Sequence, residues 1–181
     1  MAKNKAIFFD RDGIVNYRIV DGYVSKIDEF HFIPDFFNFF ESIKKVGFLA
    51  ILVSNQQGVG KGIITIEKLA EIHKFMQITL EKVTKFKFDD IYVCTELAQI
   101  NSYRRKPNPG MILEAINKWN IERTQSWMIG DSISDVIAGK RAGINTILIS
   151  SQNKLISEAD KHFDSLIFES FLPYICVESS I

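Results

Sequence analysis

At 181 residues the chain has the length of one ordinary domain with its own hydrophobic core. Hydrophobic residues account for 46% of the chain and charged residues for 24%, which is typical of a globular protein and excludes a disordered chain. Lys plus Arg and Asp plus Glu number 22 each, so there is no net charge to attract nucleic acid or an anionic membrane. We expect one domain over residues 1–181, with no nucleic acid and no membrane among its partners.

The apolar segments predict neither export nor membrane insertion. Residues 6–9 are the only apolar run before Asp10, and they are too few for the core of a signal peptide. The longest purely apolar run, residues 48–53, is far shorter than the roughly 20 residues of a membrane-spanning helix. Cys94 and Cys176 lie far apart and do not form a dense disulfide framework. We therefore expect a soluble protein of the reducing cytoplasm.

Six short apolar runs are expected to be strands. Their apolarity is nearly continuous, as in a parallel sheet that is covered on both faces, and helical patterns lie between most of them. This order predicts the α/β class, with a doubly wound (Rossmann-like) parallel sheet flanked by helices. The six runs are residues 6–9, 48–53, 91–94, 127–129, 146–149 and 166–168.

Between the first two strands we expect a flap and a helix. Residues 13–32 are too long for a tight turn and are expected to form a small hairpin flap over a site, with no large cap domain. The helix is predicted between Pro34 and Gly47, and its crowded aromatic residues are expected to pack in the core rather than bind a ligand. Its inward-facing residues are Phe36, Phe39, Phe40 and Ile43.

Three further helices have clear start or stop signals. One follows Thr65, a plausible N-cap, and a second begins at Asn108, where an N-cap side chain precedes Pro109. A third is expected over residues 134–142, and it ends at Gly143 because glycine suits the left-handed C-terminal position. The apolar stripe of the first of these helices is Leu69, Ile72, Met76, Leu80 and Val83.

Polar residues follow several of the predicted strands. In a doubly wound sheet, ligands bind beyond the carboxyl ends of the strands, so these residues are candidates for a functional site. The four groups are Asp10 with Asp12, Ser54 with Asn55, Arg105 with Lys106, and Asp131 with Asp135.

These groups supply what phosphoryl transfer requires. One carboxylate can attack phosphorus and a second can move the proton, while a metal ion, a hydroxyl and an ammonium group stabilise the phosphate oxygens. Asp10 and Asp12 are two residues apart and so face the same side of an extended segment. Asp10, Asp131 and the main-chain carbonyl of Asp12 offer the oxygen ligands that Mg²⁺ prefers.

The chain resembles the haloacid dehalogenase-like phosphatase superfamily, whose four motifs are matched in order by FFDRDG, LVSNQ, RRKPNPGM and MIGDSISD. It is similar more narrowly to the branch that contains the heptose bisphosphate and histidinol-phosphate phosphatases, on the strings FFDRDGIVN, DGYV, VSNQQGVGKG and RKPNPGM. The resemblance covers about residues 5–149. A single Asp-x-Asp is weak evidence, but four motifs in order at predicted strand ends and helix starts are specific together.

The resemblance implies a role for each matching residue. Asp10 would be the nucleophile, and Asp12 would protonate the leaving oxygen and then activate water. Ser54 and Lys106 would hold the transferred phosphoryl group. The implied Mg²⁺ ligands are Asp10, Asp12 and Asp131, with Asp135 behind them, and the implied substrate-binding residues are Asp21, Gly22, Tyr23, Asn55, Gln56, Gln57, Arg105 and Ser132.

One feature of the branch is missing. Its heptose phosphatases usually carry a zinc loop, Cys-x-His followed by Cys-x-Cys, before the Arg-Lys pair. Here residues 94–96 read Cys-Thr-Glu and residues 102–104 read Ser-Tyr-Arg. A lone thiolate cannot hold tetrahedral zinc, so we predict no structural zinc and expect Cys94 to pack at a strand end.

Structural roles remain open for some of these residues. Ser132 and Asp135 have the spacing of a helix N-cap and its third residue. Ser54 and Asn55 could simply turn the chain. The histidines have no ligand or base spacing and are expected to pack or lie on the surface; they are His31, His73 and His162.

The resemblance predicts hydrolysis of a sugar phosphate, namely heptose 1,7-bisphosphate at its 7-phosphate. It also implies a monomer that acts in the synthesis of nucleotide-activated heptose for lipopolysaccharide. Histidinol phosphate or another small phosphomonoester remains an alternative substrate. A phospho-accepting signalling domain is an alternative of another class, although such a domain lacks an acid/base carboxylate at the position of Asp12.

Overall fold

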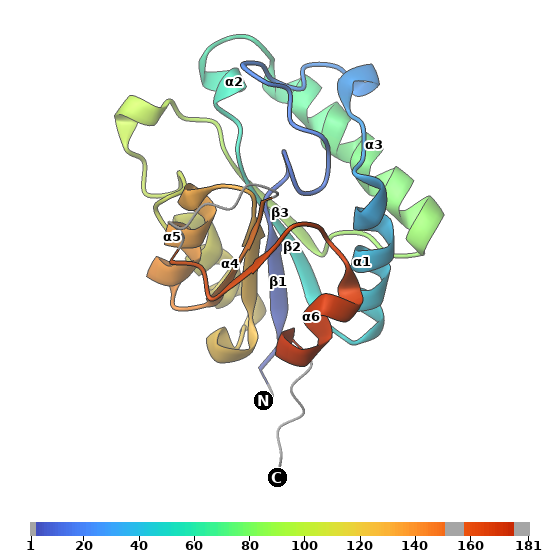
Figure 1. Cartoon of the computed structure of the whole chain (residues 1–181). Coiled ribbons are helices and arrows are strands. Elements are labelled where there is room, and N and C mark those ends of the chain that lie inside the picture. The colour runs from blue at the N-terminus through green and yellow to red at the C-terminus, as the bar shows by residue number, and fades with distance from the viewer. Residues whose placement is uncertain (1–2, 151–157, 176–181) are drawn as a thin grey trace.

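The computed structural model describes residues 3–150 and 158–175, which form a six-stranded sheet in the order β3-β2-β1-β4-β5-β6 (Figure 1). Every neighbouring pair of strands is parallel. The parallel α/β architecture predicted from the apolar runs is thereby confirmed. The strands are β1 (Ala6–Phe9), β2 (Leu49–Asn55), β3 (Asp90–Cys94), β4 (Trp127–Gly130), β5 (Asn145–Ile149) and β6 (Lys161–Phe163).

Helices cover both faces of the sheet. One face packs against α1, α3 and α6, and the other packs against α4 and α5 (Figure 1). Their bounds are α1 (Pro34–Lys45), α2 (Gln57–Gly60), α3 (Ile66–Thr84), α4 (Gly110–Trp119), α5 (Ile133–Ala142) and α6 (Phe168–Ile175), with short 3₁₀ helices at Ile27–Glu29, Ala98–Ile100 and Arg123–Gln125.

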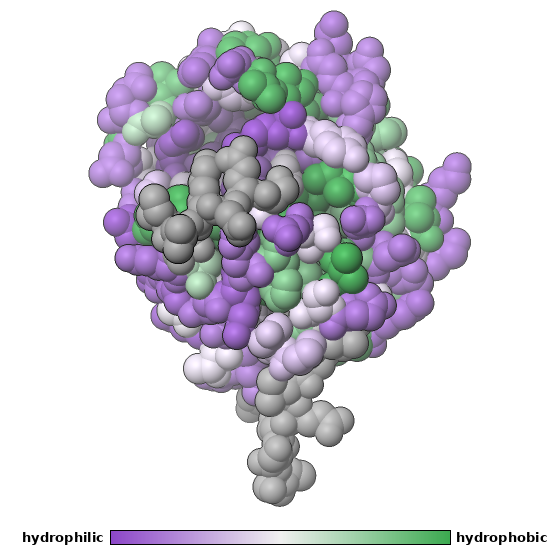
Figure 2. All heavy atoms as spheres, in the orientation of Figure 1, coloured by the Kyte–Doolittle hydropathy of each residue, from purple (hydrophilic) through white to green (hydrophobic). Residues whose placement is uncertain are grey.

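The central strand β1 joins the two apolar layers. Phe9 lies in the layer beneath α1, where its ring meets that of Phe36 edge-on at a centroid distance of 5.5 Å. Phe8 points to the opposite face and packs with residues of α4 and α5. The predicted inward face of α1 is confirmed, because Phe36, Phe39, Phe40 and Ile43 are buried. The face of the molecule shown in Figure 2 is mostly hydrophilic, with small apolar patches.

The last predicted strand, residues 166–168, is wrong. The sixth strand is β6, which is not fully buried and pairs with β5 at the edge of the sheet. An edge strand needs less apolar burial than a central one, so its sequence lacks the signal that marks the other strands. Leu166 is buried, but Phe168 begins α6.

Two details of the predicted helices also differ. Val83 is 54% exposed, because the buried stripe of α3 passes from Leu80 to Thr84, which lies closer to the same line of a helix with 3.6 residues per turn. Asn108 is not an N-cap: α4 begins at Gly110, and the Asn108 amide donates to the Ser102 carbonyl at 2.9 Å. The remaining signals are confirmed, since the Thr65 hydroxyl accepts from the Lys68 amide and Gly143 ends α5 at φ 75°.

Residues 13–32 form a flap over a cavity as predicted, but the predicted small hairpin is reduced to one antiparallel bridge. The ends of this segment meet through a bridge between Asn16 and Phe32 and a hydrogen bond from the Tyr17 amide to the His31 carbonyl at 2.9 Å. Between them the chain forms a loop with one short 3₁₀ helix, and this loop lies above the carboxyl ends of the strands, near α2 and α3 (Figure 1). Among the described residues, no helix is both long and apolar enough to cross a membrane.

Candidate active site

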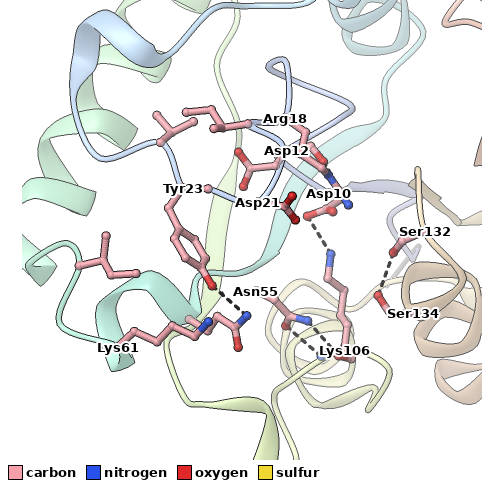
Figure 3. Close-up of a pocket in the computed structure, with 15 residues that line it drawn as sticks. Asp10, Asp12, Arg18, Asp21, Tyr23, Asn55, Lys61, Lys106, Ser132 and Ser134 are labelled. Atoms are coloured by element: carbon pink, nitrogen blue, oxygen red, sulfur yellow. Dashed lines mark hydrogen bonds and ion pairs between the residues drawn. The ribbon is translucent and has the colours of Figure 1, made fainter.

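A cavity of about 630 Å³ opens at the carboxyl ends of the strands (Figure 3). Asp10 reaches it from the end of β1, Asn55 from the end of β2 and Lys106 from the loop before α4. The flap closes one side of it. The predicted site residues that line the cavity are Asp10, Asp12, Asp21, Gly22, Tyr23, Asn55, Gln57, Lys106 and Ser132.

Lys106 is the buried cation of the site. Its side chain is 2% exposed, and its ammonium nitrogen lies 2.9 Å from Asp10 Oδ1, 2.7 Å from Asp135 Oδ1 and 2.7 Å from the Val53 carbonyl. Burial opposes the charge on Lys106, but the carboxylates of Asp10 and Asp135 outweigh it and raise the pKa of Lys106 above its ordinary value. The lysine therefore remains charged beside Asp10.

Three carboxylates gather next to this lysine. Asp10, Asp131 and Asp135 each offer an oxygen within 4.8 Å of the others. Burial, and then the nearby charge of Asp135, raise the pKa of Asp10 to about 6, although Lys106 lowers it. Burial and the charge of Asp10 raise the pKa of Asp131 to about 7. A hard divalent cation would neutralise the negative charges of these carboxylates, and an all-oxygen donor set fits Mg²⁺.

The backbone at Gly13 allows these acids to approach. Gly13 has φ 96°, and a Cβ atom placed there would lie 1.9 Å from Asp131 Oδ2. Only glycine fits both requirements. The glycine that follows the Asp-x-Asp pair therefore allows the loop after β1 to lie against the loop after β4.

The Asp12 carboxylate is held apart from these three acids. Arg11 Nη2 donates to both of its oxygens at 2.9 Å, Asn16 donates to Oδ1 and Gln56 donates to Oδ2, each at 2.9 Å. Burial raises the pKa of Asp12, but these donors together hold it below its ordinary value. The main-chain carbonyl of Asp12 is linked to Asp131 through Arg18, whose Nη2 donates to both.

Arg11 and His73 complete the support of Asp12 and were not among the predicted site residues. Arg11 is 1% exposed, and its Nη1 lies 3.4 Å from His73 Nε2. Burial, followed by the charge of Arg11, lowers the pKa of His73 to about 4, so the ring is neutral and accepts from Arg11. Of the surface or packing role expected for His73, the structure shows packing. Its contact with Arg11 depends on tertiary structure.

The lowered pKa of His73 should make the stability of the protein sensitive to acid. The unfolded chain protonates His73 near its ordinary value of 6.5, whereas the folded protein does so only near 4, so the unfolded state binds more protons between these pH values and stability falls as pH falls through them. His73→Gln keeps an acceptor for Arg11 but cannot titrate. From pH 7 to pH 4.5, we expect its free energy of unfolding to fall by about 2 kcal/mol less than that of the unchanged protein. Urea unfolding at both pH values measures it. The exposed His31→Gln is the control, and equal slopes for both variants would contradict the prediction.

Several predicted substrate contacts lie behind or beside the cavity. Gln56 is 4% exposed, and its amide donates to Asp12 Oδ2 and to Ser54 Oγ, so it faces these two residues rather than the cavity. The Ser54 side chain is buried at the same place. Arg105 is not among the lining residues, but its guanidinium donates at 3.3 Å to Oε1 of Gln57, which lines the cavity.

Hydrogen bonds order the remaining predicted residues. Asn55 pairs with the main chain of Lys106, donating to its carbonyl at 2.9 Å and accepting from its amide at 3.0 Å (Figure 3). The Gln57 amide donates to the Tyr23 hydroxyl at 3.0 Å. Ser132 and Asp135 form the capping box that their spacing indicates at the start of α5, while Ser132 also lines the cavity and Asp135 also contacts Lys106.

The three positions that remain lie in the flap and at the end of β3. Asp21 has a positive φ of 52° in the flap, which places it and Gly22 at the mouth of the cavity. Cys94 is buried at the end of β3, with its Sγ atom 3.7 Å from Glu96 Oε2. The absence of structural zinc stays a prediction.

The fold and site define a class of protein. A parallel α/β sheet whose first strand ends in two carboxylates, with a buried lysine and further acids at the same edge, is suited to phosphoryl transfer through an aspartate. Residues 103–170 match the HAD-hydrolase-like family model. A D-glycero-beta-D-manno-heptose-1,7-bisphosphate 7-phosphatase from Helicobacter pylori is 38% identical over 155 residues, which are 86% of this chain and 88% of that protein. The chain belongs to the haloacid dehalogenase-like phosphatases.

Other relatives agree with this assignment. A D-glycero-alpha-D-manno-heptose-1,7-bisphosphate 7-phosphatase from Burkholderia mallei is 34% identical over 154 residues, 81% of this chain and 80% of that protein. The crystal structure of D,D-heptose 1,7-bisphosphate phosphatase from B. bronchiseptica, complexed with magnesium and phosphate, superposes with a TM-score of 0.85 at 25% identity. That match covers 93% of this chain and 98% of the other.

Proposed function

We propose that this phosphatase removes the 7-phosphate of D-glycero-D-manno-heptose 1,7-bisphosphate in a Mg²⁺-dependent reaction. The observation that supports it most is the buried, charged Lys106 beside Asp10, with Asp131 close by, at the edge of a cavity. A cation fixed in a water-poor place stabilises the charge of a transferring phosphoryl group. The names of the relatives supply the substrate.

The proposed reaction has two steps. Asp10 attacks phosphorus and the bond to the sugar oxygen breaks, while Asp12 gives its proton to that oxygen. Asp12 then takes a proton from water, which attacks the aspartyl phosphate, releases inorganic phosphate and restores Asp10. A Mg²⁺ held by Asp10, Asp131 and the Asp12 carbonyl would neutralise the phosphate oxygens.

The lowered pKa of Asp12 suits the second step, in which it activates water, better than the first, in which it protonates the sugar oxygen. An ionised Asp12 can act at once as the base that activates water. To act first as an acid, it must gain a proton when the substrate binds. The negative charge of the incoming phosphate favours that proton, because a nearby like charge disfavours the ionised carboxyl group.

The cavity is suited to a sugar with two phosphates. Its volume of about 630 Å³ lies within the range of roughly 300–1,000 Å³ found for small-molecule sites. Arg18 lines it beside Asp131, Lys61 lines it beside Tyr23, and Arg105 contacts Gln57 of its lining, so cations are available for a second phosphate. We further expect a monomeric enzyme of the cytoplasm that contains no zinc.

Turnover tests this function directly. Purified protein with Mg²⁺ is expected to release phosphate from heptose 1,7-bisphosphate with a higher kcat/KM than from histidinol phosphate or other sugar phosphates. Both anomers should be compared, because relatives are named for each. A preference for histidinol phosphate would favour the alternative substrate. No release from any phosphomonoester, with a phosphorylated protein that persists for minutes, would contradict the phosphatase proposal.

A further inference from the structure

Arg18 of the flap occupies a distinctive position in the site. Its Nη2 atom donates to Asp131 Oδ1 at 2.6 Å and to the main-chain carbonyl of Asp12 at 3.2 Å. The Arg18 side chain is 50% exposed and the Asp131 side chain 20% exposed. One cationic nitrogen therefore joins the loop after β1 to the loop after β4, through an arginine that can turn toward solvent.

These two oxygens are the ones that a divalent cation would need. Asp131 and the Asp12 carbonyl belong to the predicted ligand set of Mg²⁺, and the oxygens of Asp10, Asp131 and Asp135 lie close enough together to hold a metal ion. Arginine keeps its charge at any ordinary pH, so it cannot give way by losing a proton. A metal ion and the guanidinium would also repel one another at contact distance. The divalent ion and the Arg18 guanidinium therefore compete for the same two oxygens.

The cavity itself offers a new position for the released Arg18 guanidinium. Arg18 lines the cavity, as does Lys61, whose ammonium lies 5.4 Å from the centre of the Tyr23 ring. Among the described residues, Lys61 forms no ion pair with a carboxylate within 4.0 Å. A guanidinium binds phosphate through two parallel hydrogen bonds.

We propose that Arg18 exchanges with the divalent cation on Asp131 and the Asp12 carbonyl, and that the released guanidinium binds the substrate phosphate that is not hydrolysed. The second half rests on the proposed function; the first half does not. Metal binding then prepares the cavity for a bisphosphate. Arg18 is thus a residue that determines specificity and that links metal binding to substrate binding.

The first measurement uses no substrate. Titration calorimetry with Mg²⁺ or Mn²⁺ on full-length Arg18→Gln is expected to give about three- to tenfold tighter ion binding than the unchanged protein, because a partly exposed ion pair no longer competes. Lys61→Gln removes a cation from the same cavity without touching the ligand oxygens, so its ion affinity should not change. Unchanged or weaker ion binding by Arg18→Gln would overturn the exchange.

The second measurement compares two substrates at saturating Mg²⁺. Arg18→Gln is expected to raise KM for heptose 1,7-bisphosphate about tenfold, the loss of one charge-assisted contact, with little change in kcat. KM for heptose 7-phosphate should stay the same, and Arg18→Lys should recover part of the loss. An equal rise in KM for both substrates would overturn the role in binding the second phosphate. Tighter ion binding in a protein that hydrolyses neither substrate would support the exchange and reject only the proposed function.

Discussion

Replacing Asp10 with Asn is expected to lower phosphate release by about 10⁴-fold or more, because an amide cannot attack phosphorus. The fold should survive, since Asn has nearly the same shape and Lys106 keeps its contact with Asp135 at 2.7 Å. Steady-state phosphate release and thermal unfolding measure the two effects.

The control for this variant is Asp28→Asn, which changes an exposed acid on the flap and should leave both quantities unchanged. Mass spectrometry adds an independent test, because rapid quenching during turnover should detect phosphate on Asp10 in the unchanged enzyme only. Retention of a few per cent of activity by Asp10→Asn would exclude Asp10 as the nucleophile.

Replacing Lys106 with Met should damage both activity and stability. The change leaves Asp10 and Asp135 facing each other without the buried cation that lies 2.9 Å and 2.7 Å from their oxygens. Removal of one partner from a buried ion pair typically costs about 3–5 kcal/mol. Loss of the cation beside the phosphoryl group should lower kcat by about 10²–10³-fold, as for other fixed charge stabilisers.

The stability loss in Lys106→Met should depend on pH. Without the lysine, the pKa of Asp10 rises further above its value of about 6, so the folded variant holds protons that the unfolded chain releases. Its stability therefore falls as pH rises, and the difference from the unchanged protein should be larger at pH 8 than at pH 5. Urea unfolding without divalent ions measures this.

Two further variants show whether the stability loss of Lys106→Met comes from uncompensated buried charge. Adding Asp135→Asn to Lys106→Met should recover part of the stability, because one of the two uncompensated charges disappears. Lys118→Met removes an exposed lysine, 59% exposed and paired with Asp90, and should change stability by no more than about 0.5 kcal/mol. A loss of the same size in both single-lysine variants would show that Lys106 has no special place in the fold.

The sequence by itself was sufficient for five of the six strands of the sheet and for the position of the site. A strand buried on both faces must be apolar along its length, so β1 and β4 are visible as short apolar runs. The carboxyl ends of parallel strands meet at one edge, so the polar residues that follow these runs had to lie near one another. The proximity of Asp10 and Asp131 follows from these two local facts.

Tertiary structure alone decided which way the side chains point and what holds them. β6 is an edge strand with little apolar burial, and no local pattern distinguishes it. Gln56 turns back to Asp12, while Arg18 crosses from the flap to Asp131, a residue far away in the sequence. Such contacts depend on the distance between segments that only the folded sheet brings together, and the charge balance of the site depends on them because Coulomb energy and burial are properties of three-dimensional positions.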